Sequence, residues 1–272
     1  MRLLWDARVG HSLPEGARTS RSLDECDQTA QRPTAMHHFG VLVPSTNTTV
    51  EIEYSRLLPP ALQVHVARIP LLSSGAETTP RSGDADVDYQ ARLLGSAKVE
   101  VVALAQTGAS LFSDDFDDRI TRRMSEAAGV PAITSARAIG LAVRALGARR
   151  VALVTPFPIA VLKLLVGHYT GKYGLEVVAS ESFSGSDSVL YPALGQELAR
   201  DAIARTDRPE IEVFIVPGGN FPTMPFISDW ERAVGKPVIT TNQAALWAMI
   251  QIMRTDEKLP SFGRLLEEMP AI

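Results

Sequence analysis

The chain has 272 residues, of which 45% are hydrophobic and 21% are charged, and its formal net charge is −4 at pH 7. This composition is typical of a globular protein with a substantial core, and the lack of a basic excess argues against a nucleic-acid partner. No apolar run reaches the roughly 18 residues that a membrane-spanning helix requires. We therefore expect a cytoplasmic protein that handles a small molecule.

Residues 1–35 differ in composition from everything that follows. They mix charged residues with Gly, Pro, Ser and Thr and show no sustained apolar period, which predicts a disordered extension. The alternative is that the natural start is Met36, just before the first expected strand. Cys26, the only cysteine, lies in this segment and is expected to be an exposed, non-catalytic thiol. A lone cysteine excludes an internal disulfide and a multi-cysteine metal cage.

From Phe39 onward, short apolar runs alternate with longer amphipathic ones. The apolar runs are the expected strands, at 39–43, 63–69, 99–105, 132–134, 150–155, 176–180, 212–216 and 237–240. The amphipathic runs are the expected helices, at 89–98, 118–128, 136–146, 158–173, 195–206 and 243–254. This alternation predicts parallel sheets with right-handed crossovers, covered by helices on both faces.

Three stretches of the first half recur in the second half at a nearly constant offset. The matched pairs are FGVLVPSTNTTV with RVALVTPFPIAV, VEVVALAQTGAS with IEVFIVPGGNFPT, and VPAITSARAIGLAV with KPVITTNQAALWAM. The repeat predicts an α/β fold of two pseudo-symmetric Rossmann-like lobes, each with a four-stranded parallel sheet flanked by helices. We place the lobes at 36–147 and 148–254, followed by a C-terminal tail or helix at 255–272. The helix at 136–146 suits a lobe contact or a dimer interface equally well, which leaves a homo-oligomer open.

Neutral hydrogen-bonding residues follow the strands whose carboxyl ends should share one edge. Ligands of open parallel sheets collect at that edge, and helix N-termini there favour an anion such as a carboxylate. The sequence therefore predicts a site for a small acid, although each of these side chains also suits a helix cap. The residues are Ser45 and Asn47 after the first strand, Gln106 and Thr107 after the third, Thr155 after the fifth, and Gly218, Gly219 and Asn220 after the seventh.

Three longer segments carry a resemblance to a known family. VLVPSTNTTVEIEY, TSARAIGLAVRALGARRVALVTPFP and GKPVITTNQAALW resemble the maleate cis–trans isomerase and arylmalonate decarboxylase branch of the aspartate/glutamate racemase superfamily, from Phe39 to about Arg254. The resemblance implies a cofactor-free site between two lobes and a small carboxylic or dicarboxylic acid as substrate. It also implies cysteine chemistry.

The positions that should carry this chemistry depart from the family pattern. Gln106 and Gly218 stand where the racemases and maleate isomerases have paired cysteines, and arylmalonate decarboxylases keep the second of these. Phe157 replaces an expected tyrosine, and Asp187–Ser188 replaces an expected Asp–Asn pair. The amide of Gln106 donates and accepts hydrogen bonds but transfers no proton near neutral pH.

Three hypotheses follow. The first is a cofactor-independent isomerase or decarboxylase with non-cysteine chemistry, and Asp187 is the substitute proton donor best placed by the resemblance. The alternatives are a non-catalytic acid-binding protein and a hydrolase or hydratase that positions a water. Asp114, Asp115 and Tyr191 are further candidates in expected loops, but residues 114–118 are more typical of a solvated acidic turn. No nucleotide-binding or metal-binding motif is present in the sequence, so we expect no cofactor and no metal.

Overall fold

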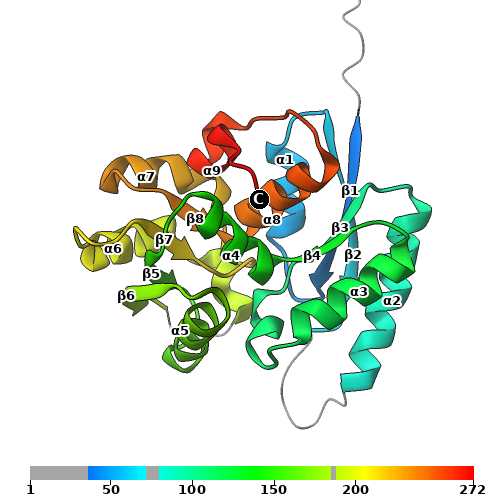
Figure 1. Ribbon diagram of the computed structural model, residues 1–272, viewed down its shortest axis with the longest axis horizontal. Coiled ribbons are helices and arrows are strands. Elements are labelled where there is room, and N and C mark those ends of the chain that lie inside the picture. The colour runs from blue at the N-terminus through cyan, green and yellow to red at the C-terminus, as the bar shows by residue number, and fades with distance from the viewer. Residues whose placement is uncertain (1–35, 72–79, 185–187) are drawn as a thin grey trace, which may run out of the picture. The chain divides into compact units, whose positions relative to one another are not determined.

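The computed structural model describes residues 36–71, 80–184 and 188–272, which belong to one compact unit (Figure 1). The expected disordered extension, Cys26 and Asp187 lie outside the described residues. The fold is therefore built from the part of the chain that contains the internal repeat.

The first half forms a parallel sheet with the strand order β2-β1-β3-β4. The strands are β1 (His37–Pro44), β2 (Leu62–Ile69), β3 (Val101–Leu104) and β4 (Ala132–Thr134). The helices are α1 (Val50–Leu57), α2 (Pro80–Ser96), α3 (Phe116–Ala128) and α4 (Ser135–Ala145), and a 3-10 helix η1 (Thr107–Leu111) follows β3. Phe39 of β1 lies opposite Val101 of β3, and both are fully buried, as apolar strands covered on two faces should be.

The second half repeats this topology with the order β6-β5-β7-β8, also parallel. The strands are β5 (Arg150–Thr155), β6 (Glu176–Ser182), β7 (Val213–Val216) and β8 (Val238–Thr240). The helices are α5 (Ile159–Tyr173), α6 (Gln196–Thr206), α7 (Ile227–Val234), α8 (Thr241–Met253) and α9 (Arg264–Glu268), with 3-10 helices η2 (Ser188–Ala193), η3 (Met224–Phe226) and η4 (Pro260–Phe262). The expected fold class and the internal repeat are confirmed.

Three short helices, α1, α7 and α9, were missed by the sequence prediction, and α2 begins earlier than expected. α1 and α7 have only eight residues each, and α9 has five, so each gives too few turns for a clear apolar period. The first turns of α2 contain Arg, Ser, Gly and Asp, a composition typical of a loop. The expected strand at 99–105 is reduced to Val101–Leu104.

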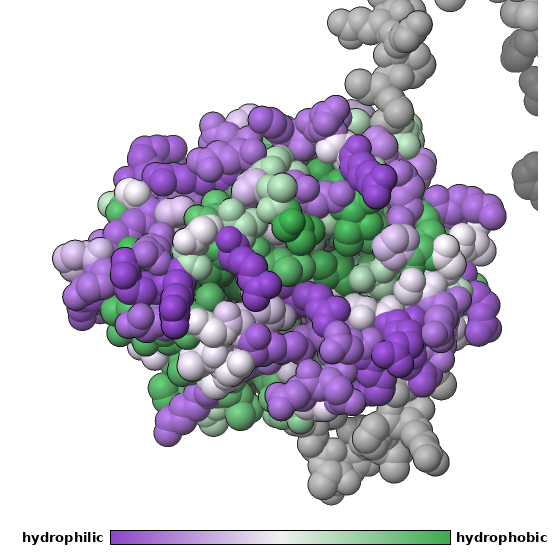
Figure 2. Space-filling model, in the orientation of Figure 1, coloured by the Kyte–Doolittle hydropathy of each residue, from purple (hydrophilic) through white to green (hydrophobic). Residues whose placement is uncertain are grey.

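The two halves share a hydrophobic core in which α4 and α8 lie side by side. α8 belongs to the second half, yet it packs against β3 and β4 of the first sheet as well as against β8. Its side chains are buried on nearly all sides, which explains why it is apolar throughout. In Figure 2 apolar residues gather in the middle of the face over α8 and β4, surrounded by hydrophilic ones. The helix expected at 136–146 thus makes an internal contact between the halves.

Candidate functional site

Side-chain hydroxyls connect the strand-end loops of the two halves. Thr107 opens η1, and its Oγ1 lies 3.1 Å from the Oγ of Ser135 and 3.3 Å from the Oγ1 of Thr241. The Thr241 hydroxyl in turn accepts a hydrogen bond of 2.9 Å from the backbone N–H of Gly218. Two residues predicted from the sequence, Thr107 and Gly218, are thereby brought together across the two sheets.

Ser135 and Thr241 were not among the predicted site residues, although the repeat contained a signal for them. Each is the first residue of its helix, α4 or α8, directly after an edge strand. They occupy equivalent places in the matched segments VPAITSARAIGLAV and KPVITTNQAALWAM. Thr134 and Thr240, which precede them, cap the two helices through their side chains.

The two positions that the resemblance assigns to cysteine differ in their backbone. Gln106 follows β3, is 9% exposed and precedes η1 with an ordinary negative φ of −138°. Gly218 follows β7 with a φ of 136°, a conformation that residues with a side chain rarely adopt. A Cβ at Gly218 would also lie 3.1 Å from the Cγ of Pro156. The Gly218 backbone therefore favours glycine over any thiol-bearing residue.

Asn47 and Asn220 join α1 to the second half. The Oδ1 of Asn47 accepts hydrogen bonds of 3.0 Å from the backbone N–H groups of Thr49 and Val50, so it caps the start of α1, the alternative that the sequence left open. The Oδ1 of Asn220 accepts from the backbone N–H of Thr48 at 2.9 Å, and its carbonyl accepts from the hydroxyl of Thr49 at 2.9 Å.

Ser45 lies at the exposed margin of this region. Its backbone N–H donates to the carbonyl of Ile69 at 2.7 Å, and its own carbonyl accepts from Arg68 at 3.4 Å. Arg68 also pairs with Glu51 at 2.8 Å, the ordinary ion-pair role that the sequence favoured for it. The backbone bonds of Ser45 thus tie the end of β1 to β2.

Thr155 and Phe157 order the end of β5. The fully buried hydroxyl of Thr155 donates to the carbonyl of Pro217 at 3.1 Å and accepts from the N–H of Phe157 at 3.2 Å. The ring of Phe157 meets the ring of Tyr191 edge-on, with centroids 5.6 Å apart. Tyr191 is buried and lies in η2 rather than in the expected loop, and Ser188 begins the same 3-10 helix.

Glu53, a buried carboxyl of α1, was missed by the sequence prediction. Its Oε1 accepts from the N–H groups of Thr223 and Met224 at 2.7 and 2.9 Å, and its Oε2 accepts from the Nδ2 of Asn242 at 2.6 Å. Asn242 also donates to the carbonyl of Gly219 at 3.2 Å, which links Glu53 to the predicted site. Burial raises the pKa of Glu53, and the three hydrogen bonds offset only part of that rise.

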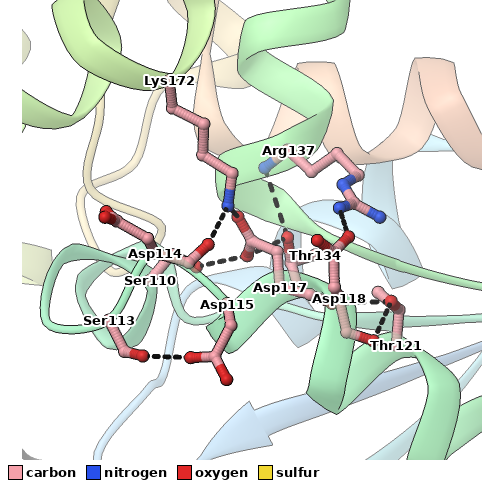
Figure 3. Close-up of polar contacts among 10 residues, drawn as sticks. All are labelled: Ser110, Ser113, Asp114, Asp115, Asp117, Asp118, Thr121, Thr134, Arg137 and Lys172. Atoms are coloured by element: carbon pink, nitrogen blue, oxygen red, sulfur yellow. Dashed lines mark hydrogen bonds and ion pairs between the residues drawn. The ribbon is translucent and has the colours of Figure 1, made fainter.

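Asp117 corrects the expectation of a solvated acidic turn at 114–118. Asp114 and Asp115 are exposed, but the side chain of Asp117 is fully buried. Its Oδ1 accepts from the hydroxyls of Ser110 and Thr134, each at 2.7 Å, and its Oδ2 accepts from the Nζ of Lys172 at 2.8 Å (Figure 3). Burial raises the pKa of Asp117, but the hydrogen bonds from Lys172, Thr134 and Ser110 outweigh it and hold the pKa below its ordinary value.

A search of the described residues for metal ligands and membrane spans gives a short result. No group of three His, Cys, Asp or Glu side chains in that part of the chain is placed to hold a metal ion. None of the described helices is both long and apolar enough to cross a membrane. His38 and His65 lie together on β1 and β2, with 2.9 Å between ring nitrogens, away from the strand-end loops.

Matched parallel sheets with hydrogen-bonding groups at their shared strand ends define a class of two-sheet α/β proteins built from an internal repeat. Within that class, the family model described as arylmalonate decarboxylase matches residues 39–266, and the chain belongs to this family. The resemblance seen in the sequence is confirmed, and it supports an isomerase-like or decarboxylase-like protein.

Individual relatives agree with this assignment. The chain is 28% identical to an arylmalonate decarboxylase from Bordetella bronchiseptica, over 89% of this chain and 99% of the relative. It is 26% identical to a maleate isomerase from Pseudomonas putida, over 86% and 98%. A crystal structure of a maleate isomerase from Pseudomonas putida S16 with maleate superposes with a TM-score of 0.75 at 28% identity, covering 85% of this chain and 98% of that one.

Proposed function

We propose that this protein is a cofactor-independent decarboxylase that acts on a small malonate-like acid bound between its two halves, with chemistry that uses no cysteine. The link from Thr107 through Thr241 to Gly218 carries the proposal, because it gathers the strand-end loops of both sheets in one place. Gln106 directly precedes Thr107, and Gly219 directly follows Gly218, so their amide groups border the same place.

Decarboxylation fits these residues better than isomerisation does. Isomerisation of an alkene through covalent addition requires an activated nucleophile such as a thiolate, and the chain has one cysteine, Cys26, outside the matched family region. Loss of carbon dioxide from a malonate leaves an enediolate, which hydrogen-bond donors fixed in place stabilise without any nucleophile. Hydroxyl and amide donors are the groups that Thr107, Thr155, Gly219 and the neighbouring residues supply.

The enediolate must then receive a proton on carbon. Asp187, placed here by the resemblance, is our first candidate, and Tyr191, stacked against Phe157, is the second. A water held by Gln106 is the third source, and it connects this proposal to the hydratase alternative. A non-catalytic acid-binding protein needs none of these donors.

The test is proton NMR in heavy water with phenylmalonate, maleate and aspartate as separate substrates. We expect carbon dioxide release from phenylmalonate and deuterium on the product α-carbon, with activity retained in Cys26→Ser. Thr241→Val should lower the rate about tenfold or more, since it breaks the link to Gly218. Loss of activity in Cys26→Ser would overturn the non-cysteine chemistry. Thermal stabilisation by phenylmalonate without turnover would support acid binding alone, and conversion of maleate to malate would support the hydratase.

A further inference from the structure

The buried carboxylate of Asp117 joins three elements from both halves of the chain. Asp117 is in the first turn of α3, Ser110 is in η1, and Thr134 ends β4. Lys172 reaches the carboxylate from α5 of the second half (Figure 3). The same Lys172 Nζ donates to the carbonyl of Asp114 at 3.0 Å, so one ammonium group holds two points of the segment between η1 and α3.

These contacts lie on both sides of Thr107. Ser110 is in the same 3-10 helix as Thr107, and Thr134 directly precedes Ser135, whose hydroxyl lies 3.1 Å from that of Thr107. One oxygen of Asp117 therefore fixes η1 and the start of α4 together. A shift of this carboxylate would move Thr107 and its hydroxyl partner relative to each other.

Packing alone does not account for an acid at this position. A buried carboxylate is costly unless it is paired and hydrogen-bonded, and an apolar pair of similar volume would fill the space at little or no cost in stability. Here the carboxylate accepts three hydrogen bonds, and its cation is supplied by a helix that also packs against η1. The arrangement suits a group whose role is to hold a loop in register.

We propose that Asp117 is a positioning residue of the site: it fixes η1, and with it Gln106 and Thr107, while Lys172 of the second half holds the carboxylate in place. The role of the positioned loop in turnover rests on the proposed function. The positioning itself is a property of the fold and is tested without turnover.

The experiment compares two charge-free double variants. Asp117→Asn with Lys172→Met keeps an oxygen that accepts from Ser110 and Thr134, whereas Asp117→Leu with Lys172→Met removes it. By hydrogen-exchange mass spectrometry we expect faster exchange in peptides covering 104–112 and 134–138 for the leucine variant only, with α8 unchanged as the internal reference. Asp207→Leu with Lys236→Met removes an ion pair of 2.6 Å remote from η1 and should leave these peptides unchanged.

Turnover supplies the second readout. The leucine variant should lower kcat for phenylmalonate about tenfold or more, because a small misplacement of a binding loop is amplified in rate, and the asparagine variant should remain near the parent. If the leucine variant does not fold, Ser110→Ala removes the η1 donor without leaving a charge unpaired and should show the same local exchange. Equal protection of 104–112 in all variants, or a rise that includes α8, would overturn the positioning role. If the parent turns over no acid, the proposed function fails while the exchange result still decides the positioning.

Discussion

The two halves are joined at two buried carboxyls that are stabilised in opposite ways. The Asp117 contact accepts from two hydroxyls and from the ammonium group of Lys172, and its pKa is held below the ordinary value. The Glu53 contact accepts from two backbone N–H groups and one amide, all neutral donors, and its pKa is raised by burial. Neutral donors offset part of the cost of burial, whereas a cation in contact more than offsets it.

This difference separates two ways of fixing a loop. At the Asp117 contact the charge is part of the structure, so removing either charged partner leaves the other uncompensated. At the Glu53 contact the carboxyl serves mainly as a pair of acceptors for η3 and Asn242, and its charge is a burden rather than an aid. The four predictions below test that contrast, beginning with the largest expected effect.

Lys172→Met should have the largest effect on stability. It leaves the fully buried carboxylate of Asp117 without its cation, and we expect the free energy of unfolding to fall by about 3 kcal/mol. The measurement is urea unfolding at neutral pH. Adding Asp117→Asn should recover most of the loss, and the contrast between the two contacts would be wrong if the double variant were no more stable than Lys172→Met alone.

A pair of glycine substitutions compares how tightly each contact is packed. A Cβ at Gly140 of α4 would overlap the ring of Tyr173 in α5, whereas a Cβ at Gly219 would lie 3.0 Å from the Oδ1 of Asn242. We expect Gly140→Ala to lower the free energy of unfolding by about 2 kcal/mol and Gly219→Ala by about 1 kcal/mol. Urea unfolding of both variants checks the order. An equal loss would mean that α5 moves away from α4 at no greater cost than Asn242 moves from Gly219.

The order of strands and the location of the strand-end loops were predictable because local patterns encode them. Apolar runs mark the strands, and the repeat places Thr107 and Gly218 at equivalent sheet edges. The burial of Glu53 and Asp117 was not predictable in this way. Each sits in a charged first turn that looks solvated along the sequence, and each is buried by partners from the other half, Asn242 and Lys172. Contacts that arise only when the halves meet leave no periodic signal in either segment.

Glu53→Gln should cost less than about 1 kcal/mol at neutral pH, because a neutral side chain keeps one acceptor oxygen for the two N–H groups and sheds a buried charge. The new amide would face the Nδ2 of Asn242, and a turn of the Asn242 amide would present its Oδ1 instead. That Oδ1 has no hydrogen-bond partner among the described residues. Thermal unfolding compared with Lys172→Met measures the asymmetry, and a loss as large as that of Lys172→Met would mean that the Glu53 charge is also structural.

The pH dependence of stability should differ in sign between the two contacts, with a smaller effect than the substitutions above. The raised pKa of Glu53 means that its stabilising contribution is fully present below its ordinary value of 4.5 and is lost as pH rises through the folded-state pKa. The lowered pKa of Asp117 gives a contribution that is present above its ordinary value of 3.8 and is lost as pH falls through the folded-state pKa. The deficit of Glu53→Gln relative to the parent should therefore shrink as pH rises from 4.5. The deficit of Asp117→Asn should shrink only in acid, below 3.8. Urea unfolding of the parent and both variants across this range gives the two slopes. Slopes of the same sign would show that one carboxyl is held in a charge state opposite to the one its hydrogen-bond donors imply.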